Sequence, residues 1–325
     1  MKTYTLTKKV LVIFSLMTAT SIASAQSYPD RAITLVVPNP PGGLVDTSAR
    51  LLSEPLTRVI GQTVVVDNKP GASGNIAYQY VANAKPDGYT LLISYSGYHV
   101  GNPALMDKLP WDPVKDFSPI ALLTVSTNVI AVHPSVPVNN LKEFIAYAKA
   151  NPGKLNYASQ GNGSVSHIGT EMFKQTTGID MVHVPYKGSG PAIQDVLAGQ
   201  VQVFISTPPS VMQHVQSGKL KGLAVTGKNR HPGMPNVPTT AEAGLPSFQL
   251  ESWVALFAPA GTPAPIVTKL TDSVKKSLAL PEVKERADAA GVELRYLTPA
   301  QTEALVKKEL PYWSKVIKSA NITLD

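Results

Sequence analysis

A repeated unit of strand, small-residue loop and helix constrains the fold of this chain more than any other feature. Short runs rich in β-branched residues alternate with loops of Gly, Ser and Pro and with helix-like segments, which is the pattern of parallel α/β structure. The predicted strands are residues 33–37, 63–66, 89–93, 155–158, 181–184, 201–205 and 220–225. The sequence therefore predicts an α/β protein whose strands come in two series.

The first predicted helix follows the loop of residues 39–43. Asp46 or Thr47 is a suitable N-cap, and the helical pattern continues toward Ile60. Pro55 interrupts this pattern, because proline lacks the N–H that an interior helix position donates. The sequence leaves open whether Pro55 kinks the helix or ends it.

Two long apolar stretches, residues 120–132 and 248–258, are the predicted crossings between two domains. Two domains are also the default expectation at this length, because single cores usually divide near 250 to 300 residues. We expect one domain to comprise residues 26–124 and 250–325, and the other to comprise residues 125–249.

The N-terminus has the pattern of an export signal. Lys2, Lys8 and Lys9 precede a short apolar run over residues 10–17, and Ala23-Ser24-Ala25 provides a small-residue cleavage site. The run is too short for the roughly 20 apolar residues of a membrane-spanning helix. A cleaved signal peptide of residues 1–25 and a periplasmic location are therefore expected.

The composition excludes several function classes. Removal of the signal peptide lowers the formal charge from +7 to +4, since it takes away three lysines and no acid, and so small an excess does not indicate nucleic-acid binding. The chain has no cysteine, which excludes disulfides, thiolate metal ligands and a cysteine nucleophile.

We expect the mature protein to be a monomer.

Catalytic and cofactor motifs are missing from the sequence. There is no G-x-S-x-G nucleophile elbow and no G-x-G-x-x-G fingerprint. Residues 222–228 match most of a phosphate-binding loop, but Asn229 stands where Ser or Thr should hold magnesium. The six histidines lack the spacing of a metal site on a helix. We therefore expect no enzymatic activity, no catalytic residue, no metal and no cofactor.

Six strand ends carry Gly- or Ser-containing loops that lead into helices. In open α/β sheets, ligands bind beyond the carboxyl ends of the strands, so six such loops on two facing domains should line one cleft. Glycine lets the backbone approach a ligand, and free N–H groups at helix N-termini favour an anion. His167 lies at one of these helix starts, where it either contacts the ligand or caps the helix, and His99 is either a ligand contact or a surface loop residue.

Several segments resemble the substrate-binding proteins of tripartite tricarboxylate transporters, also called the Bug family of periplasmic receptors. The matching segments are residues 40–46, 68–76, 86–92, 157–159, 163–164 with His167, 184–188 and 257–263, and they span nearly the whole chain in order. The resemblance implies a two-domain Venus-flytrap periplasmic binding protein fold. It also implies that the cleft binds a small carboxylate through backbone amides, loop hydroxyls and waters, and that the protein delivers this ligand to membrane permease subunits.

Two departures from the family pattern bear on the ligand. Ser206 and Thr207 stand where family members often carry an acid, which favours a ligand with a second anionic end over an amino acid. Tyr95 and Tyr98 make the third loop more aromatic than is usual in the family, so a flat ring could stack there, although Tyr98 could equally pack at the rim. The chain also resembles the terephthalate-binding members of the family.

We therefore expect an aromatic dicarboxylate, with terephthalate as the first choice. A citrate-type carboxylate receptor, a periplasmic sensor component and, less favoured, an enzyme on the same fold are the alternatives. The predicted ligand-binding residues are Gly42, Gly43, Ala72, Ser73, Gly74, Ser94, Tyr95, Ser96, Tyr98, His99, Ser159, Gly163, Ser164, His167, Tyr186, Ser206 and Thr207.

Overall fold

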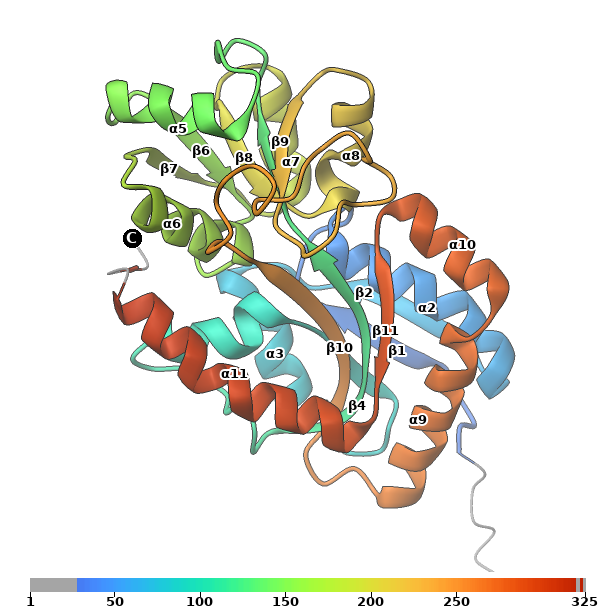
Figure 1. Ribbon diagram of the computed structural model, residues 1–325. Helices are drawn as coiled ribbons and strands as arrows, with labels where there is room; N and C mark the ends of the chain where they lie inside the picture. The colour runs from blue at the N-terminus through green and yellow to red at the C-terminus, as the bar shows by residue number, and fades with distance from the viewer. Residues whose placement is uncertain (1–27, 320–321, 324–325) are drawn as a thin grey trace, which may run out of the picture.

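The computed structural model describes residues 28–319 and 322–323, and in this part of the chain the strands form two separate sheets (Figure 1). The predicted signal peptide lies outside the described residues. The strands are β1 (Ile33–Val37), β2 (Val64–Asn68), β3 (Thr90–Tyr95), β4 (Phe117–Thr127), β5 (Val129–Val132), β6 (Asn156–Ser159), β7 (Val182–Pro185), β8 (Val203–Ser206), β9 (Lys221–Val225), β10 (Glu251–Pro259) and β11 (Glu293–Leu297). The seven predicted strands correspond to β1, β2, β3, β6, β7, β8 and β9, with ends displaced by at most two residues.

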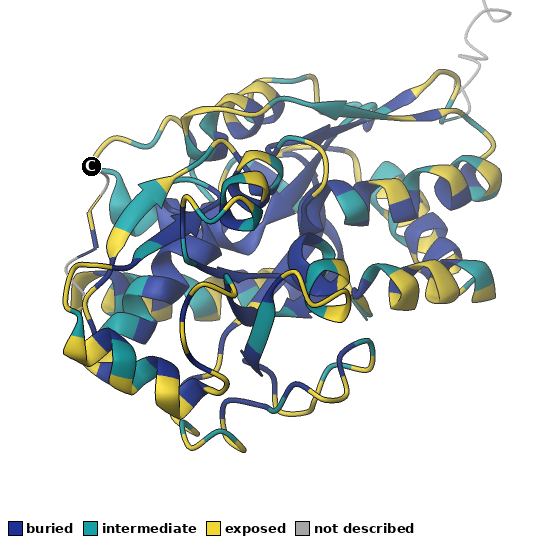
Figure 2. Ribbon diagram, turned by 90° about the horizontal axis from the view of Figure 1, so that it is seen from above, coloured by how far each residue is buried: buried dark blue, intermediate teal, exposed yellow. Residues whose placement is uncertain are grey.

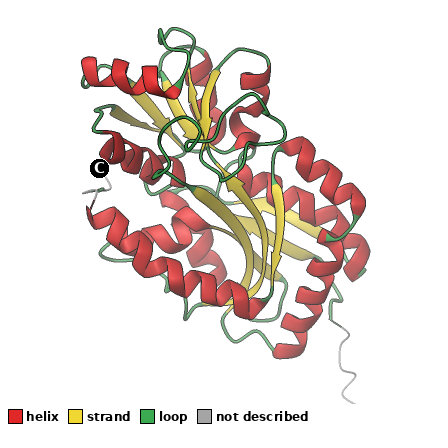
Figure 3. Cartoon of the chain, in the orientation of Figure 1, coloured by secondary structure: helices red, strands yellow, loops and turns green. Residues whose placement is uncertain are grey.

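Helices flank both sheets (Figure 3). They are α2 (Leu44–Ile60), α3 (Asn75–Ala82), α4 (Asn102–Leu105), α5 (Leu141–Ala150), α6 (Val165–Thr177), α7 (Ser189–Leu197), α8 (Pro208–Gln216), α9 (Ala264–Leu278), α10 (Pro281–Ala290) and α11 (Pro299–Ser319), with short turns η1 (Ala72–Gly74) and η2 (Gly97–Gly101). Among the described helices, none combines the length and the apolar character needed to cross a membrane. The α/β prediction is confirmed.

The first lobe, as we call the part built on the six-stranded sheet, has the strand order β11-β4-β10-β3-β1-β2. β1 runs parallel to β2 and β3, while β10 runs antiparallel to β3 and β4. Helix α2 packs against α9 and α10, and α11 packs against β4 and η2. The parallel strands bring the loops after β1, β2 and β3 to the same edge of the sheet.

The second lobe is built on the five-stranded sheet, in the order β7-β6-β8-β5-β9. β6 runs parallel to β7 and β8, and β5 runs antiparallel to β8 and β9. The loops after β6, β7 and β8 therefore also share one edge, and they lead into α6, α7 and α8.

Two long neighbouring strands, β4 and β10, carry the chain between the lobes (Figure 1). They pair antiparallel from Phe117 with Pro259 to Thr127 with Glu251, and Asn128 separates β4 from β5 in the other sheet. Residues 125–127, which we expected in the second domain, thus pair within the first sheet. The division into residues 26–124 with 250–325 and residues 125–249 stays a prediction.

Helix α2 differs from its predicted form at the N-terminus. It begins at Leu44 with Gly43 as N-cap, so neither Asp46 nor Thr47 caps it. Asp46 lies in the first turn, where a carboxylate is stabilised by the helix dipole. Pro55 is inside the helix and buried, and the helix continues past it to Ile60.

The centre of each sheet is buried and its edge strands are partly exposed (Figure 2). In the first lobe, β3 and β10 are buried along nearly their whole length, whereas the edge strand β11 has no fully buried residue. Because both faces of each sheet are covered, side chains on both sides of a central strand are buried. The sequences of the central strands are therefore continuous apolar runs rather than alternating patterns.

Candidate functional site

A pocket of about 380 Å³ lies between the lobes, at the edge where the strand-end loops of both sheets meet. The first lobe lines it with the loops after β1 and β2 and with the ring of Tyr98, and the second lobe lines it with the loops after β6 and β7. The lining residues are Pro38, Pro40, Pro70, Gly71, Ala72, Ser73, Gly74, Tyr98, Gln160, Gly161, Tyr186, Lys187 and Gly188. This is the location at which open α/β sheets bind small molecules.

Larger hollows of the described surface lie elsewhere. One of about 430 Å³ lies beside the crossing strands, lined by residues 125–127 and 227–232 among others, and one of about 720 Å³ lies along α3. Neither collects the strand-end loops of both lobes. We therefore take the pocket between the lobes as the candidate site.

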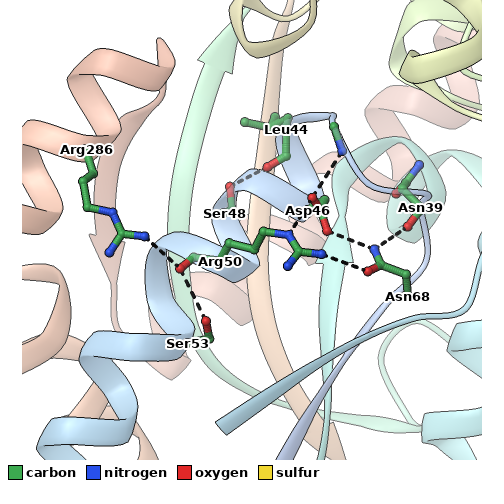
Figure 4. Close-up of polar contacts among 9 residues, drawn as sticks. Asn39, Leu44, Asp46, Ser48, Arg50, Ser53, Asn68 and Arg286 are labelled. Carbon is green, nitrogen blue, oxygen red and sulfur yellow. Dashed lines mark hydrogen bonds and ion pairs between the residues drawn. The ribbon is translucent and has the colours of Figure 1, made fainter.

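The loop after β1 is held by the buried carboxylate of Asp46 (Figure 4). This carboxylate accepts hydrogen bonds from the backbone N–H of Gly42 at 3.2 Å and from Asn68 Nδ2 at 3.1 Å. Asn68 Nδ2 also donates to the backbone oxygen of Asn39 at 2.8 Å. The first loop is thereby fixed to the end of β2, where the second loop begins.

Arg50 completes this network from the next turn of α2 (Figure 4). Its Nε donates to Asp46 Oδ2 at 3.0 Å, and its Nη2 donates to Asn68 Oδ1 at 3.4 Å. The hydrogen bond to Asp46 raises the pKa of Arg50. Since the Asp46 carboxylate accepts hydrogen bonds from three donors, one of them the Gly42 N–H, it holds the loop after β1 in place.

The loop after β2 makes a left-handed turn. Gly71, Ala72, Ser73 and Gly74 all have positive φ, at 123°, 47°, 52° and 84°. Ala72 and Ser73 are the only described non-glycine residues with positive φ, a conformation that costs free energy for residues with a Cβ. Gly74 is required for a second reason, because a Cβ there would lie 2.5 Å from the ring of Tyr98.

The two predicted tyrosines occupy different places. Tyr98 lines the pocket, its hydroxyl accepts a hydrogen bond from Asn39 Nδ2 at 3.3 Å, and burial raises its pKa to about 12. Tyr95 lies behind Tyr98, edge-on at 5.3 Å between ring centroids, and is not among the lining residues. The Tyr95 hydroxyl instead accepts from the backbone N–H of Val165 in the second lobe at 3.2 Å.

Ser94, Ser96 and His99 lie in the core of the first lobe rather than in the pocket. His99 stacks on Phe257 at 4.6 Å, its Nδ1 pairs with the Ser94 hydroxyl at 2.9 Å and its Nε2 pairs with the Pro113 carbonyl oxygen at 3.0 Å. Burial lowers the pKa of His99 to about 4. The expectation of a surface or ligand-facing histidine fails here, because the chain after β3 turns inward through η2.

The loop after β6 is held together by its own side chains. The Ser164 hydroxyl caps α6 by accepting from the His167 backbone N–H at 3.3 Å, and it donates to the Gly161 carbonyl oxygen at 2.6 Å. His167 Nδ1 accepts from the Gly163 N–H at 3.2 Å. The Ser159 hydroxyl pairs with His183 Nε2 at 2.7 Å. The His167 side chain thus contacts the backbone at the start of α6, and its contact with a ligand stays a prediction.

Tyr186 is the predicted residue that the second lobe places directly in the pocket lining. Its hydroxyl donates to Asp195 Oδ2 at 2.6 Å. Ser206, at the end of β8, accepts a hydrogen bond from Nε2 of the pocket residue Gln160 at 3.2 Å. Thr207 follows as the N-cap of α8 and is buried.

Gly42 and Gly43 lie beside the pocket rather than in its lining. A Cβ on Gly43 would lie 2.8 Å from the Ser189 hydroxyl of the second lobe, so the two loops meet there. Ala72, Ser73 and Gly74 line the pocket. Contact between the predicted residues and a ligand stays a prediction.

Sequence reasoning missed Gln160 and Lys187, although both lie in loops that it had selected. Lys187 is the one charged side chain among the lining residues described here, and it is exposed. The signal was present in the Tyr186-Lys187-Gly188 motif, of which only Tyr186 is among the predicted ligand-binding residues. The pocket thus combines an apolar, proline-rich wall, two aromatic rings and one cation.

Comparisons with known proteins point to one family. Residues 48–322 match a family model described as the tripartite tricarboxylate transporter family receptor. The chain is 37% identical over 302 residues to Protein BugT of Bordetella pertussis, which covers 93% of this chain and 93% of BugT.

Solved structures agree over nearly the full length. A protein described as a periplasmic transporter is 41% identical with a TM-score of 0.89, covering 92% of this chain and 100% of its own. The R. palustris protein Rpa4515, solved with adipate, is 38% identical with a TM-score of 0.88, covering 91% of this chain and 99% of its own. The predicted periplasmic binding protein fold is confirmed by these likenesses.

Proposed function

The chain belongs to the tripartite tricarboxylate transporter receptor family, and from that premise we propose that it captures a small dicarboxylate in the pocket between its lobes and delivers it to membrane permease subunits. The observation that carries this proposal is the pocket itself. Loops from both sheets converge on it, so a ligand bound there contacts both lobes at once. Such a ligand favours the closed arrangement by its contacts with both sides.

The chemistry of the lining supports a carboxylate. Lys187 supplies a cation at the rim, and the pocket residue Gly188 is the N-cap of α7, so the N-terminus of that helix lies at the pocket. Helix N-termini and lysine ammonium groups both stabilise a negative charge. The similar protein Rpa4515 was solved with adipate, which is a dicarboxylate.

An aromatic dicarboxylate is the ligand class that we favour, with terephthalate as the first choice. Tyr98 from the first lobe and Tyr186 from the second lobe both line the pocket. A flat ring between two aromatic side chains gains stacking contacts that an aliphatic chain lacks. The ring is thus held between residues of opposite lobes, not between Tyr95 and Tyr98.

The setting of this function is the periplasm. The N-terminal pattern of Lys2, Lys8 and Lys9, the apolar run and Ala23-Ser24-Ala25 supports export with cleavage after residue 25. We propose that the mature chain acts as a monomeric receptor that releases its ligand unchanged.

Calorimetry with terephthalate, benzoate, adipate and citrate tests the proposal. Terephthalate is expected to bind most tightly, because benzoate lacks the second carboxylate and the other two lack the ring. Equal affinity for terephthalate and benzoate would disprove a two-ended site. Chromatography of the ligand after prolonged incubation checks that it is not converted, and thermal unfolding gives an independent measure, since a ligand of the native state raises the unfolding temperature.

A further inference from the structure

The hydroxyl of Thr226 joins the two points at which the chain crosses between the lobes. Thr226 directly follows β9 and is fully buried. Its Oγ1 accepts a hydrogen bond from the backbone N–H of Asn128 at 2.8 Å and donates to the backbone oxygen of Leu250 at 2.6 Å. Asn128 lies between β4 and β5, and Leu250 immediately precedes β10. One side chain of the second lobe thus holds both crossings.

The backbone of Thr226 makes the same connection. Its N–H donates to the Asn128 carbonyl oxygen at 2.9 Å, and its carbonyl oxygen accepts from the Leu250 N–H at 3.4 Å. Asn128 Nδ2 also donates to the Leu250 carbonyl oxygen at 3.4 Å. All three residues are buried, so a polar group that loses its partner here is not solvated instead. We call Asn128, Thr226 and Leu250 the hinge cluster.

Close packing fixes the hinge cluster to both lobes. Gly169 in α6 has no room for a Cβ because the Leu250 side chain fills that space, so Leu250 is seated on the second lobe. Gly227 has no room for a Cβ because of Cγ2 of Thr127, the last residue of β4 in the first lobe. Residues 226 and 227 belong to the segment that partly matches a phosphate-binding loop, and in the structure they lie at the crossings.

The crossings separate the pocket from the hollow of about 430 Å³ beside them, which we call the hinge groove. In the six-stranded sheet, β4 and β10 lie between β11, which lines the groove, and β1 and β2, whose loops line the pocket. In the five-stranded sheet, β5 lies between β9, whose following loop lines the groove, and β6 and β7, whose loops line the pocket. A rotation of the lobes about the crossings therefore widens the groove when it narrows the pocket.

We propose that the Thr226 hydroxyl is the pivot of lobe closure, an inference that rests on the proposed function. Because this hydroxyl binds both crossings, the two strands bend at one place and the lobes turn about one axis. Without it the strands bend independently, and the lobes sample more relative orientations. A closed form that is populated less often binds its ligand with a lower apparent affinity. Thr226 is outside the pocket lining, so it is a positioning residue that acts through the approach of the lobes.

Two substitutions of Thr226 and one matched control test the pivot. Thr226→Val removes the hydroxyl and keeps the shape of the side chain, whereas Thr226→Ser keeps the hydroxyl. Thr240→Val is the control, since the Thr240 hydroxyl is also buried and donates to the Phe248 carbonyl oxygen at 2.6 Å within the second lobe. Both valine variants should lower the unfolding temperature, because each removes a buried hydrogen bond.

Calorimetry with terephthalate and adipate measures the effect on capture. Thr226→Val should lower the affinity at least fivefold, while Thr226→Ser and Thr240→Val should stay within twofold of wild type. A loss of stability alone would lower the affinity of neither valine variant, so the difference between them isolates the crossing contact.

The distance across the hinge groove gives a second readout that a loss of stability does not move. The chain has no cysteine, so Asn229→Cys and Glu293→Cys, exposed positions on the two walls of the groove, take two unique spin labels. Pulsed electron paramagnetic resonance should show these labels moving apart when terephthalate or adipate binds.

In the absence of ligand, Thr226→Val should give a broader distribution of label distances than wild type, and Thr240→Val and Thr226→Ser should not. Asn128→Ala removes only the side-chain bond to Leu250 and should broaden the distribution less. It carries the test if Thr226→Val does not fold.

The pivot is overturned if either the distance distribution or the affinity of Thr226→Val matches wild type, or if Thr240→Val loses as much affinity. Labels that keep one distance while a ligand binds overturn it as well and leave the receptor function standing. A wild-type protein that binds neither acid contradicts the proposed function, and the ligand-free distance distributions then still decide on the pivot.

Discussion

Asp46 and Gly42 are four residues apart, and the carboxylate of the first accepts the backbone N–H of the second at 3.2 Å. The first turn of α2 thus holds the loop that precedes it. Since the same carboxylate accepts from Asn68 at the end of β2, one buried side chain sets the spacing of two pocket loops. Gly42 itself has a φ of 97°, so the loop depends on glycine as well as on the carboxylate.

Asp46→Ala should lower the free energy of unfolding by about 1.5 to 3 kcal/mol, the usual effect of losing hydrogen bonds to a charged group. Ligand affinity should fall as well, because the loop after β1 loses its anchor. Urea denaturation and calorimetry measure the two effects. Asp46→Asn keeps an acceptor for Gly42 and should fall between wild type and Asp46→Ala.

Glu54→Ala serves as the control for Asp46, since it removes an acid of the same helix that pairs with Arg286 at the surface. It should change stability by less than about 0.5 kcal/mol. If Asp46→Ala were as mild as Glu54→Ala, the proposed anchoring role of Asp46 would be untenable.

Gly74→Ala should lower both the free energy of unfolding and the affinity for the ligand. The new methyl group meets the Tyr98 ring and requires a left-handed backbone at φ 84°. Gly61→Ala isolates the backbone cost, because Gly61 has a φ of 80° and a Cβ there meets nothing within 4 Å. We expect a loss of about 1 to 2 kcal/mol for Gly61→Ala and a greater loss for Gly74→Ala. Only Gly74→Ala should alter binding, and equal behaviour of the two would count against the Tyr98 contact.

Tyr95→Phe should shift the protein toward an open form. The lost hydroxyl accepts the Val165 N–H across the lobes, while the ring itself lies outside the pocket lining. Small-angle scattering should show a larger radius of gyration for the ligand-free variant than for wild type, and saturating ligand should bring both to the same value. Tyr312→Phe, at an exposed position of α11, is the control. A radius that does not depend on ligand in either protein would argue against hinge closure.

His99 should make stability depend on pH in the mildly acidic range. Its pKa of about 4 in the folded protein is below the ordinary value near 6.5, so the unfolded chain binds more protons between these two values. The free energy of unfolding therefore falls as the pH falls from about 6.5 to about 4, by about 3 kcal/mol in total. His99→Phe should remove this part of the pH dependence, as measured by urea denaturation at several pH values. An unchanged slope in the variant would show that His99 is not the group responsible.

Local sequence determined the strand-loop-helix units. β1 has the predicted bounds of residues 33–37, and the other six predicted strands end within two residues of those observed, because β-branched runs bounded by Gly and Pro are local signals. The predicted N-cap of α2 was wrong for a reason that is only partly local. Asp46 has the chemistry of an N-cap, but its carboxylate is used by Gly42 and Asn68.

Only the tertiary structure decided which residues of the chosen loops face the pocket. Tyr95, Tyr98 and His99 are close neighbours in the chain, yet Tyr98 lines the pocket, Tyr95 at the end of β3 packs edge-on against Tyr98, and His99 stacks on Phe257. Hydrogen-bond partners and burial come from segments distant in sequence, so the sequence alone determined where the pocket loops are, and the packing of the two lobes determined which side chains they present.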